Sequence, residues 1–381
     1  MMKNWTGKPG YPVVKAELKK GKVNLSQSRF FASPLSAKKA KDKTKWEIPI
    51  SFKNDKVNFG EAGFYRTSYS KELLEKLKSP VENKLLSPRD RLGIIRDLFA
   101  LGEAGTIPTT DALEFLSAYR NEDNYTVWLE IAMGLGRLEA LLARRSHRAA
   151  GLDKLVIKLF SPIFDRLGWE KNVNEPHTDT LLRSLVISRL GRSGHEEIIA
   201  EARNKFTKGN IYPDIRGAVY AVVASSGGMK EYEIFLKLYL KETLHEEKNR
   251  LGGALGDFRD EKILKLTSEF SMSSNVRQQD TVSILSSVGS NPVGRDIWLS
   301  FIQKNWNTLV TRYGDGGHTL ASVVKAISGS AMENHLKSFK KFFATHEAPG
   351  AKRAIQQVLE RLEGSVAWLK RDGKIIEKFL R

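Results

Sequence analysis

The sequence contains no cysteine, and this absence excludes disulfide bonds, thiolate zinc sites and a cysteine nucleophile. A chain without thiols fits a reducing compartment, so we predict a cytoplasmic protein. No apolar run approaches the roughly 18 residues that a membrane-spanning helix needs, so no membrane partner is expected. Residues 1–11 also lack the apolar stretch of a signal peptide.

The short motifs of catalysis are missing as well. His195-Glu196 and His245-Glu246 begin like the H-E-x-x-H zinc motif, but neither has a second histidine one helical turn later. There is no G-x-S-x-G turn and no G-K-[ST] phosphate loop. We therefore expect no catalytic residue, no metal ligand and no cofactor in this chain, and we predict that it is inactive alone.

Positive charge is abundant: 62 Lys and Arg against 44 Asp and Glu give a net charge of +18. Such a balance suits nucleic acid, an anionic membrane or acidic partners. The basic residues are spread along the chain, however. The densest clusters, Lys38–Lys45 and Arg144–Arg148, are interpreted as a solvated loop between strands and as a helix C-terminus. No nucleic-acid-binding motif accompanies them, so we do not expect a nucleic-acid partner.

The first part of the chain has the pattern of β-structure. Tyr11–Leu18 and Val23–Phe31 flank a turn at residues 19–22 and predict a hairpin. Trp46–Phe52 alternates apolar residues around a proline, which indicates an edge strand. Val57–Tyr69 supplies the last strand. These segments predict a small antiparallel β-sandwich over residues 1–68.

From about Ser70 the apolar residues recur with the helical period of 3.6. The expected helices are near 70–78, 87–103, 109–119, 124–143, 151–167, 178–191, 195–207, 213–226, 229–242, 244–256, 260–270, 275–288, 294–312, 318–328, 332–345 and 349–379. Helix pairs without a sequence repeat predict a curved α-superhelix of HEAT or armadillo type over residues 69–381, with a concave surface.

Tryptophans at helical positions could in principle form a stacking platform for a ligand. Packing between helices is the favoured interpretation, because large aromatic side chains at these positions usually fill the core. The tryptophans concerned are Trp128, Trp298, Trp306 and Trp368.

The segment from residue 57 to 101 joins the two regions. Ser87 is placed to cap a helix, Pro88 follows at the first helical position, and Asp90 occupies the capping-box position. The sequence GFYRTSY at 63–69, followed by LSPRDRLGIIRDLFALGEAG at 86–105, closely resembles a junction in zinc aminopeptidases of the puromycin-sensitive and endoplasmic-reticulum kind. There it joins a third, β-sandwich domain to the C-terminal helical domain.

The resemblance extends over almost the whole chain. Its further segments appear in the family's order at residues 5, 10–14, 25–30, 124–128, 212–220, 246–256, 291–295, 304–306 and 366–372. Relatives have more residues between Phe52 and Val57, usually a further strand pair, so the sandwich is expected to lack a strand pair near 53–57.

The resemblance implies that this chain is the non-catalytic C-terminal portion of an enzyme that removes N-terminal amino acids from peptides. The zinc ligands and the general base would lie in a catalytic domain ahead of residue 1, so no catalytic residue is transferred. The helical domain is expected to cap that catalytic domain, its main partner, and to shape the cavity that binds peptide substrates.

In the family the concave face binds the body and the C-terminal end of the peptide, and arginine suits a carboxylate. The candidates here are Arg216, Arg277, Arg312 and His318. The alternative is that Arg216 and Arg277 cap helix ends or pair locally, for example Arg277 with Asp280. Asp257 and Ser290 stand where endoplasmic-reticulum relatives have basic contacts, so that contact is not carried over.

Two further interpretations complete the prediction. Ser330–Asn334 resembles the G-A-M-E-N substrate motif of the same enzymes, but it lies at the start of an expected helix, so we interpret it as a chance match and Glu333 as a first-turn acid. The alternative function is a non-enzymatic α-solenoid scaffold that binds proteins or nucleic acid.

Overall fold

The computed structural model describes residues 5–40, 42–142, 146–314, 318–346 and 348–381. Its contacts divide the chain into two compact units: unit 1, residues 1–136 with 370–381, and unit 2, residues 137–369. The change from strands to helices falls near the predicted boundary at 68/69, because the last strand ends at Tyr69. Unit 1 contains both kinds of structure, so that boundary stays a prediction. None of the described helices is long and apolar enough to cross a membrane.

The elements of unit 1 are β1 (Pro12–Lys19), β2 (Lys22–Arg29), α2 (Pro34–Ala40), β3 (Phe52–Lys53), β4 (Lys56–Val57), β5 (Arg66–Tyr69), α3 (Lys71–Glu82), α4 (Pro88–Glu103) and α5 (Thr109–Phe115). Those of unit 2 are α7 (Ser146–Leu167), α8 (His177–Arg192), α9 (Glu196–Lys208), α10 (Arg216–Ser226), α11 (Met229–Lys241), α12 (His245–Leu255), α13 (Glu261–Ser271), α14 (Gln278–Ser290), α15 (Arg295–Tyr313), α16 (His318–Lys325) and α17 (Glu333–Phe343). Helices α6 (Tyr125–Leu142) and α18 (Lys352–Phe379) each contribute to both units.

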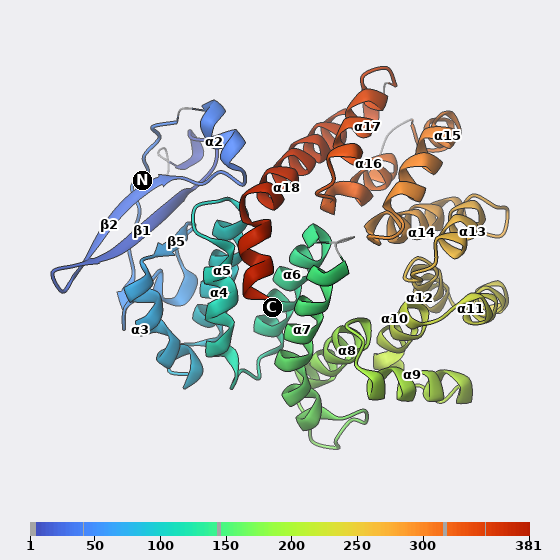
Figure 1. The fold of residues 1–381 in the computed structure, drawn as a ribbon, viewed down its shortest axis with the longest axis horizontal. Coiled ribbons are helices and arrows are strands. Elements are labelled where there is room, and N and C mark those ends of the chain that lie inside the picture. The colour runs from blue at the N-terminus through green and yellow to red at the C-terminus, as the bar shows by residue number, and fades with distance from the viewer. Residues whose placement is uncertain (1–4, 41, 143–145, 315–317, 347) are drawn as a thin grey trace. The chain divides into compact units, whose positions relative to one another are not determined.

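Unit 2 is built from two layers of helices, as the predicted helical repeat requires. Helices α8, α10, α12, α14 and α16 contact one another in succession, and α9, α11, α13 and α15 pack against them. Figure 1 shows α9, α11, α13 and α15 on the outer side of an arc, and we call them the outer layer. Helices α8, α10, α12, α14 and α16 lie on the inner side and form the inner layer.

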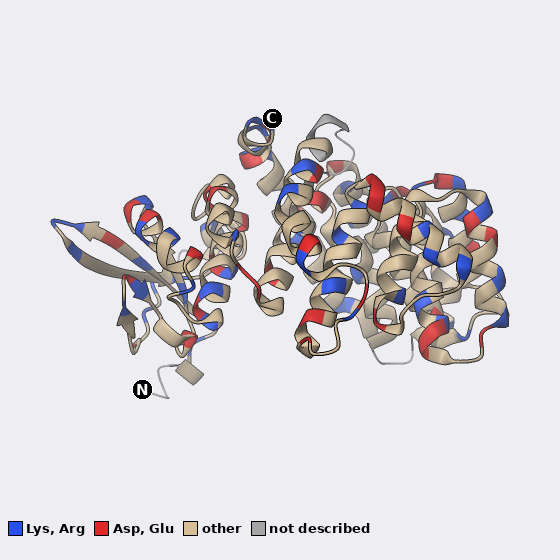
Figure 2. Cartoon of the chain, turned by 90° about the horizontal axis from the view of Figure 1, so that it is seen from below, with Lys and Arg blue, Asp and Glu red and all other residues tan. Residues whose placement is uncertain are grey.

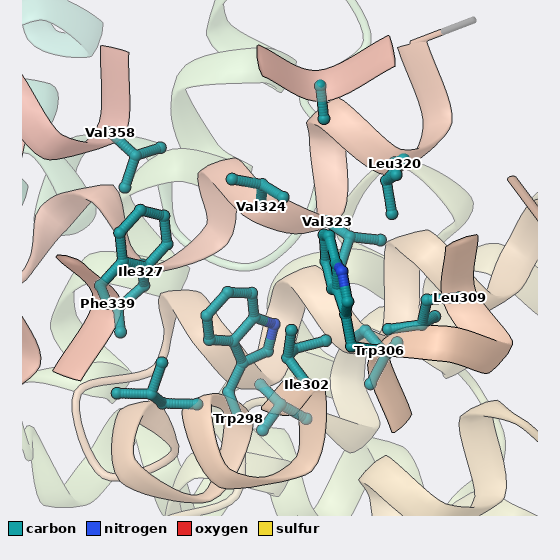
Figure 3. Packing of buried hydrophobic residues seen from close by; sticks show 14 of the residues in the cluster. Trp298, Ile302, Trp306, Leu309, Leu320, Val323, Val324, Ile327, Phe339 and Val358 are labelled. Atoms are coloured by element: carbon teal, nitrogen blue, oxygen red, sulfur yellow. The ribbon is translucent and has the colours of Figure 1, made fainter. Parts of the chain in front are cut away.

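The core of unit 2 confirms the packing interpretation of the tryptophans. Trp298 is fully buried and Trp306 is 3% exposed, and both lie among aliphatic side chains of α14–α18. Figure 3 shows their rings against Ile302, Val323 and Ile327. Trp128 and Trp368 are buried as well. The alternative of a stacking platform is therefore excluded at these four positions.

The sheet of unit 1 differs in part from the expected sandwich. β1 and β2 form the predicted antiparallel hairpin, with Lys19 opposite Lys22. The two turn residues, Lys20 and Gly21, both have positive φ, as a type I′ turn requires. β5, however, runs parallel to β1, so the sheet β2-β1-β5 is mixed rather than antiparallel.

The predicted strand at Trp46–Phe52 is largely irregular, and β3 contains its last residue. The side-chain amide of Gln27 explains this result. It donates to the Trp46 carbonyl at 2.9 Å and accepts from the Trp46 N–H at 2.8 Å. A side chain thus satisfies the backbone groups that a neighbouring strand would otherwise pair.

A tight hairpin occupies the place where relatives were expected to carry a further strand pair. Phe52 pairs with Val57 and Lys53 with Lys56. Asn54 and Asp55 between them both have positive φ, which again indicates a two-residue type I′ turn. The chain therefore closes directly here.

The two basic clusters have different outcomes. Helix α2 covers Pro34–Ala40, so the first part of the Lys38–Lys45 cluster is helical rather than a loop. Residues 41 and 143–145 lie outside the described part of the chain, so Arg144 and Arg145 are not placed. The side chains of 146–149 are not described either.

The junction between sheet and helices forms as its cap residues predict. The Ser87 hydroxyl oxygen accepts from the Asp90 N–H at 3.2 Å, and Pro88 opens α4. The Asp90 carboxylate accepts from the Ser87 hydroxyl and, at 2.6 Å, from the Gly60 N–H. One fully buried acid thus joins the start of α4 to the loop before β5.

Buried charges surround this contact. Lys56 is 1% exposed, and its ammonium group lies 2.6 Å from Glu61 and 4.0 Å from Asp90. Glu61 also accepts from Arg96 on α4 at 2.6 Å. A Cβ atom at Gly93 would lie 2.1 Å from the Glu61 carboxylate, so the close approach of loop and helix requires glycine.

Asp97, one turn further along α4, holds β5. Its carboxylate accepts from the Thr67 N–H at 2.8 Å and from Arg66 at 2.9 Å. Burial raises the pKa of Asp97 to about 6, although these contacts oppose the rise. Because the folded state then binds a proton more tightly than the unfolded state, this group favours folding increasingly as the pH falls from about 7 toward 4.

We predict that Asp97→Asn costs more stability at pH 5 than at pH 7. The variant loses the contacts at both pH values, but it also loses the contribution from protonation that the wild type gains at the lower pH. Urea unfolding of both proteins at the two pH values measures the difference. Asp123→Asn, which removes a carboxylate 55% exposed to solvent, is the control and should show no such dependence. A larger cost at pH 7 would mean that the ion pair with Arg66 dominates.

Candidate functional site

The inner layer of unit 2 gathers polar side chains where its helices begin. Arg216 opens α10, His245 opens α12, and Arg277 is the N-cap of α14. Contacts between these ends show that the helices begin side by side: Arg216 lies 3.6 Å from Glu247 of α12, and Arg277 lies 2.9 Å from His245. We call these three helix starts the N-terminal edge.

Glu247 is the centre of the first half of this edge. Its carboxylate accepts from the Tyr220 hydroxyl at 2.6 Å and from Arg250 at 2.7 Å, and Arg216 lies beyond them at 3.6 Å. Burial raises the pKa of Glu247, but the donors outweigh it and hold the pKa below its usual value. Burial of the Tyr220 hydroxyl and its hydrogen bond to Glu247 raise the pKa of Tyr220.

Arg277 organises the second half. Its guanidinium makes two contacts with the Asp280 carboxylate, at 2.6 and 3.1 Å, and donates to His245 Nε2. The local pairing with Asp280 that was left open as the alternative is therefore present. These contacts use three of the five N–H groups of a guanidinium. The side chain is 36% exposed, so the remaining donors can meet a ligand from solvent.

The other two predicted residues stand further along unit 2, Arg312 on the outer layer and His318 on the inner layer. Arg312, in the last turn of α15, makes a 3.4 Å contact with the Met272 carbonyl and is exposed. His318 is the first residue of α16, and its ring is exposed. The structure thus brings Arg216 and Arg277 to neighbouring helix starts, whereas within the described part of the chain no hydrogen bond or ion pair joins Arg312 or His318 to them.

The edge combines exposed guanidinium groups with helix N-termini, and both favour an anion. Two of its acids are buried, since the side chains of Glu247 and Asp280 are 6% and 8% exposed, whereas Glu246 in the first turn of α12 is 71% exposed and pairs with Arg250. A carboxylate from solvent could reach Arg216 and Arg277, whose side chains are 37% and 36% exposed. Sequence inspection missed Tyr220, Glu247 and His245 as members of the edge. The signal was present in the first-turn position of Glu247 and in the spacing of Arg216 and Tyr220 by one helical turn.

The two incomplete zinc motifs prove to be helix starts. His195 is the N-cap of α9 and His245 begins α12, and each is followed by two acids in the first turn. Acids there interact favourably with the positive end of the helix. Among the described residues, no group of three or more His, Cys, Asp or Glu side chains could hold a metal ion. Zinc therefore does not fit this part of the chain, and we derive no catalytic step from it.

The segment that resembles the substrate motif is also a helix start. Glu333 is an acid in the first turn of α17, as predicted. Ser330 is fully buried and contacts His335 Nδ1 at 2.7 Å, and the other ring nitrogen lies 2.5 Å from Asp296. This serine, histidine and aspartate resemble a catalytic triad, but a fully buried hydroxyl cannot reach a substrate. The arrangement holds α17 against α15.

The C-terminal ends of the inner helices carry a separate ion pair. Arg192 at the end of α8 contacts Asp257 after α12 at 2.7 Å. Burial raises the pKa of Asp257, and the arginine opposes the rise. The position is thus occupied by an acid with an internal partner, which agrees with the expectation that a basic contact is not carried over here.

Two layers of helices with a polar edge and a small N-terminal sheet define a helical-repeat domain joined to a β-module. Residues 56–364 match the family described as the ERAP1-like C-terminal domain, and the chain belongs to this family. The similarity recognised at the junction is thereby confirmed.

Curated relatives extend the match beyond the family region. The chain is 27% identical to aminopeptidase M1-A of Oryza sativa, with 97% of this chain and 46% of the relative covered. It is 28% identical to aminopeptidase M1 of Arabidopsis thaliana, with 97% and 47% covered. Aminopeptidase 2, mitochondrial, of Saccharomyces cerevisiae is 27% identical, with 100% and 43% covered. The chain spans about half the length of these relatives and aligns with their C-terminal halves.

We predict that Tyr220→Phe destabilises unit 2 by about 2 kcal/mol, because it removes a hydrogen bond to a buried carboxylate. Tyr239→Phe is the matched control. That residue is 1% exposed and its hydroxyl has no partner among the described residues, so its removal should be neutral or stabilising. Urea unfolding followed by circular dichroism measures both. Equal losses in the two variants would show that the Glu247 contact contributes nothing specific.

Proposed function

We propose that this chain is the non-catalytic C-terminal portion of a zinc aminopeptidase, and that it caps the active site and shapes the cavity for the peptide. The match to the ERAP1-like C-terminal domain over residues 56–364 carries the proposal. The relatives named above support it, since each is called an aminopeptidase and each is about twice as long as the aligned region.

The proposed division of labour follows from the residues. The other half of the protein would bind the zinc ion, which activates water for cleavage of the N-terminal peptide bond. This chain would position the substrate: the guanidinium groups of Arg216 and Arg277 at the N-terminal edge would bind its carboxylate or carbonyl groups. We assign the same role to Arg312 and His318 further along unit 2. The partners of this chain would be the catalytic domain of the same enzyme and its peptide substrates. The enzyme would act in the cytoplasm.

Arg216 is the best placed of the four for a ligand. Its 3.6 Å separation from Glu247 is longer than the contacts that Glu247 makes with Tyr220 and Arg250. Since Glu247 retains those two donors, Arg216 can turn toward a peptide without leaving a buried carboxylate unpaired. Arg277 is held by Asp280 and His245, so it would act in its present position.

A scaffold that binds nucleic acid is the second candidate, because the net charge of +18 favours it. Figure 2 shows Lys and Arg interspersed with Asp and Glu on the helices of unit 2 in that view. Alternating signs of charge suit a general solvated surface better than a phosphate-binding stripe. The peptide-cavity proposal therefore has the stronger support.

We predict that the chain binds a fluorescently labelled dodecapeptide saturably, and that amidation of the peptide C-terminus weakens binding. Arg216→Ala should weaken it about tenfold, because a charge-assisted hydrogen bond is lost. Lys237→Ala is the control, since it removes an exposed cation from the outer helix α11. Fluorescence anisotropy measures each affinity.

A short RNA serves as the competitor in the same titration. Tight RNA binding that weakens steeply with salt, together with indifference to the peptide carboxylate, would favour the scaffold and contradict the peptide role. An equal loss of peptide affinity in Arg216→Ala and Lys237→Ala would contradict the placement of the site.

A further inference from the structure

Strand β2 forms an edge of the sheet in unit 1, whose order is β2-β1-β5. Lys19 and Lys22 flank a two-residue turn and form a hydrogen-bonded pair. From there, the facing residues of β1 and β2 alternate between non-hydrogen-bonded and hydrogen-bonded pairs. The Phe30 N–H donates to the Tyr11 carbonyl at 2.8 Å, which agrees with this alternation. The N–H and C=O groups of Val23 and Leu25 therefore point away from β1.

These outward groups are left open along part of the strand. The Gln27 carbonyl, which also points outward, accepts from the Lys45 ammonium group at 2.8 Å. Nothing comparable covers Val23 or Leu25 among the described residues. The edge is thus closed at one end and open toward the hairpin tip, where Figure 1 shows β2 as the outermost strand.

An apolar groove runs beside the open edge. It has a volume of about 360 Å³ and is lined by Val14, Leu25, Ser26, Gln27, Lys45, Ile48 and Ile50. Leu25 is 43% exposed and Ile50 is 40% exposed. Open backbone groups next to an apolar groove are the two features that an added β-strand uses: the backbone pairs with the edge, and alternate side chains enter the groove.

The relatives have more residues than this chain over the aligned region. The alignments extend over 416 and 414 residues, whereas this chain has 381, so the relatives carry residues that this chain lacks. The resemblance placed such residues between Phe52 and Val57 as a further strand pair. Here the structure has the two-residue turn of Asn54 and Asp55.

Charge identifies the chemistry of an occupant. No acid lines the groove, whereas Lys45 does. Lys20 and Lys22 lie at the hairpin tip, which Figure 2 shows as basic. The acid Glu17 on β1 is already paired with Lys15 at 2.5 Å and with Lys19 at 3.1 Å. A second copy of the chain would bring the same lysines against these and be repelled.

We propose that the edge of β2 binds an extended acidic segment of a partner protein as an added strand. Its backbone pairs with Val23 and Leu25. Its apolar side chains enter the groove between Leu25 and Ile50, and its acidic side chains meet Lys22 and Lys45. The inference is independent of the peptide site proposed on unit 2, because its contacts all lie in the sheet region.

The test uses the full chain and a labelled decapeptide of alternating valine and glutamate. We expect saturable binding in fluorescence anisotropy, and slower hydrogen exchange of the Val23 and Leu25 amides in the complex. Ile50→Glu should weaken binding about tenfold, because it places an acid in the groove. Leu35→Glu is the matched control: Leu35 is 41% exposed on α2, outside the groove, and the change should leave affinity intact.

Three outcomes would overturn the proposal. The first is no binding, or binding without protection of the two amides. The second is equal weakening by both variants, or equal binding of a lysine–valine peptide or a short RNA, which would indicate a general basic surface. The third is a dimer of the free chain that Ile50→Glu dissociates in sedimentation, which would identify a second copy as the occupant.

Discussion

The carboxylate of Asp90 is the constraint on which the junction of unit 1 depends. It caps α4 through Ser87 and accepts from the backbone of Gly60, and it is fully buried while doing so. Lys56 and Glu61 supply the neighbouring charges. In such a cluster, removal of one member leaves another charge buried without its partner, which costs far more than the net contribution of the intact pair. The loop, α4 and β5 therefore hold a single arrangement.

The N-terminal edge of unit 2 uses a different balance of charge. There Glu247 and Asp280 are buried and Arg216 and Arg277 are partly exposed, so the charges of these two acids are neutralised before any ligand arrives. A substrate carboxylate would meet the donors of Arg277 that Asp280 and His245 leave over, and it would find Arg216 only weakly engaged. Local pairing and the proposed ligand binding are therefore compatible at this edge. The first concerns the stability of the helix starts, and the second uses the donors that remain.

Sequence patterns predicted the helices well and the sheet less well, for one physical reason. Helix signals are local: Ser87 and Pro88 mark the start of α4, and the expected helix at 294–312 is observed as Arg295–Tyr313. The parallel pairing of β5 with β1 depends on contacts between distant segments. The Gln27 amide that replaces a strand at Trp46 is equally non-local. The contacts at the N-terminal edge of unit 2 could not be predicted for the same reason, because Tyr220 on α10 and Glu247 on α12 meet only when the two helices pack together.

The open edge of β2 leaves unpaired backbone groups beside an apolar groove. Proteins usually protect an edge strand with lysines, prolines or bulges, because an unpaired apolar edge invites aggregation. The lysines around β2 oppose pairing with a like copy, yet Leu25 and Ile50 remain exposed beside it. Protection by charge alone would not require apolar side chains at these positions. On the proposal above, this combination favours acidic partners over basic ones, so the lysines that oppose pairing with a like copy would also select the partner.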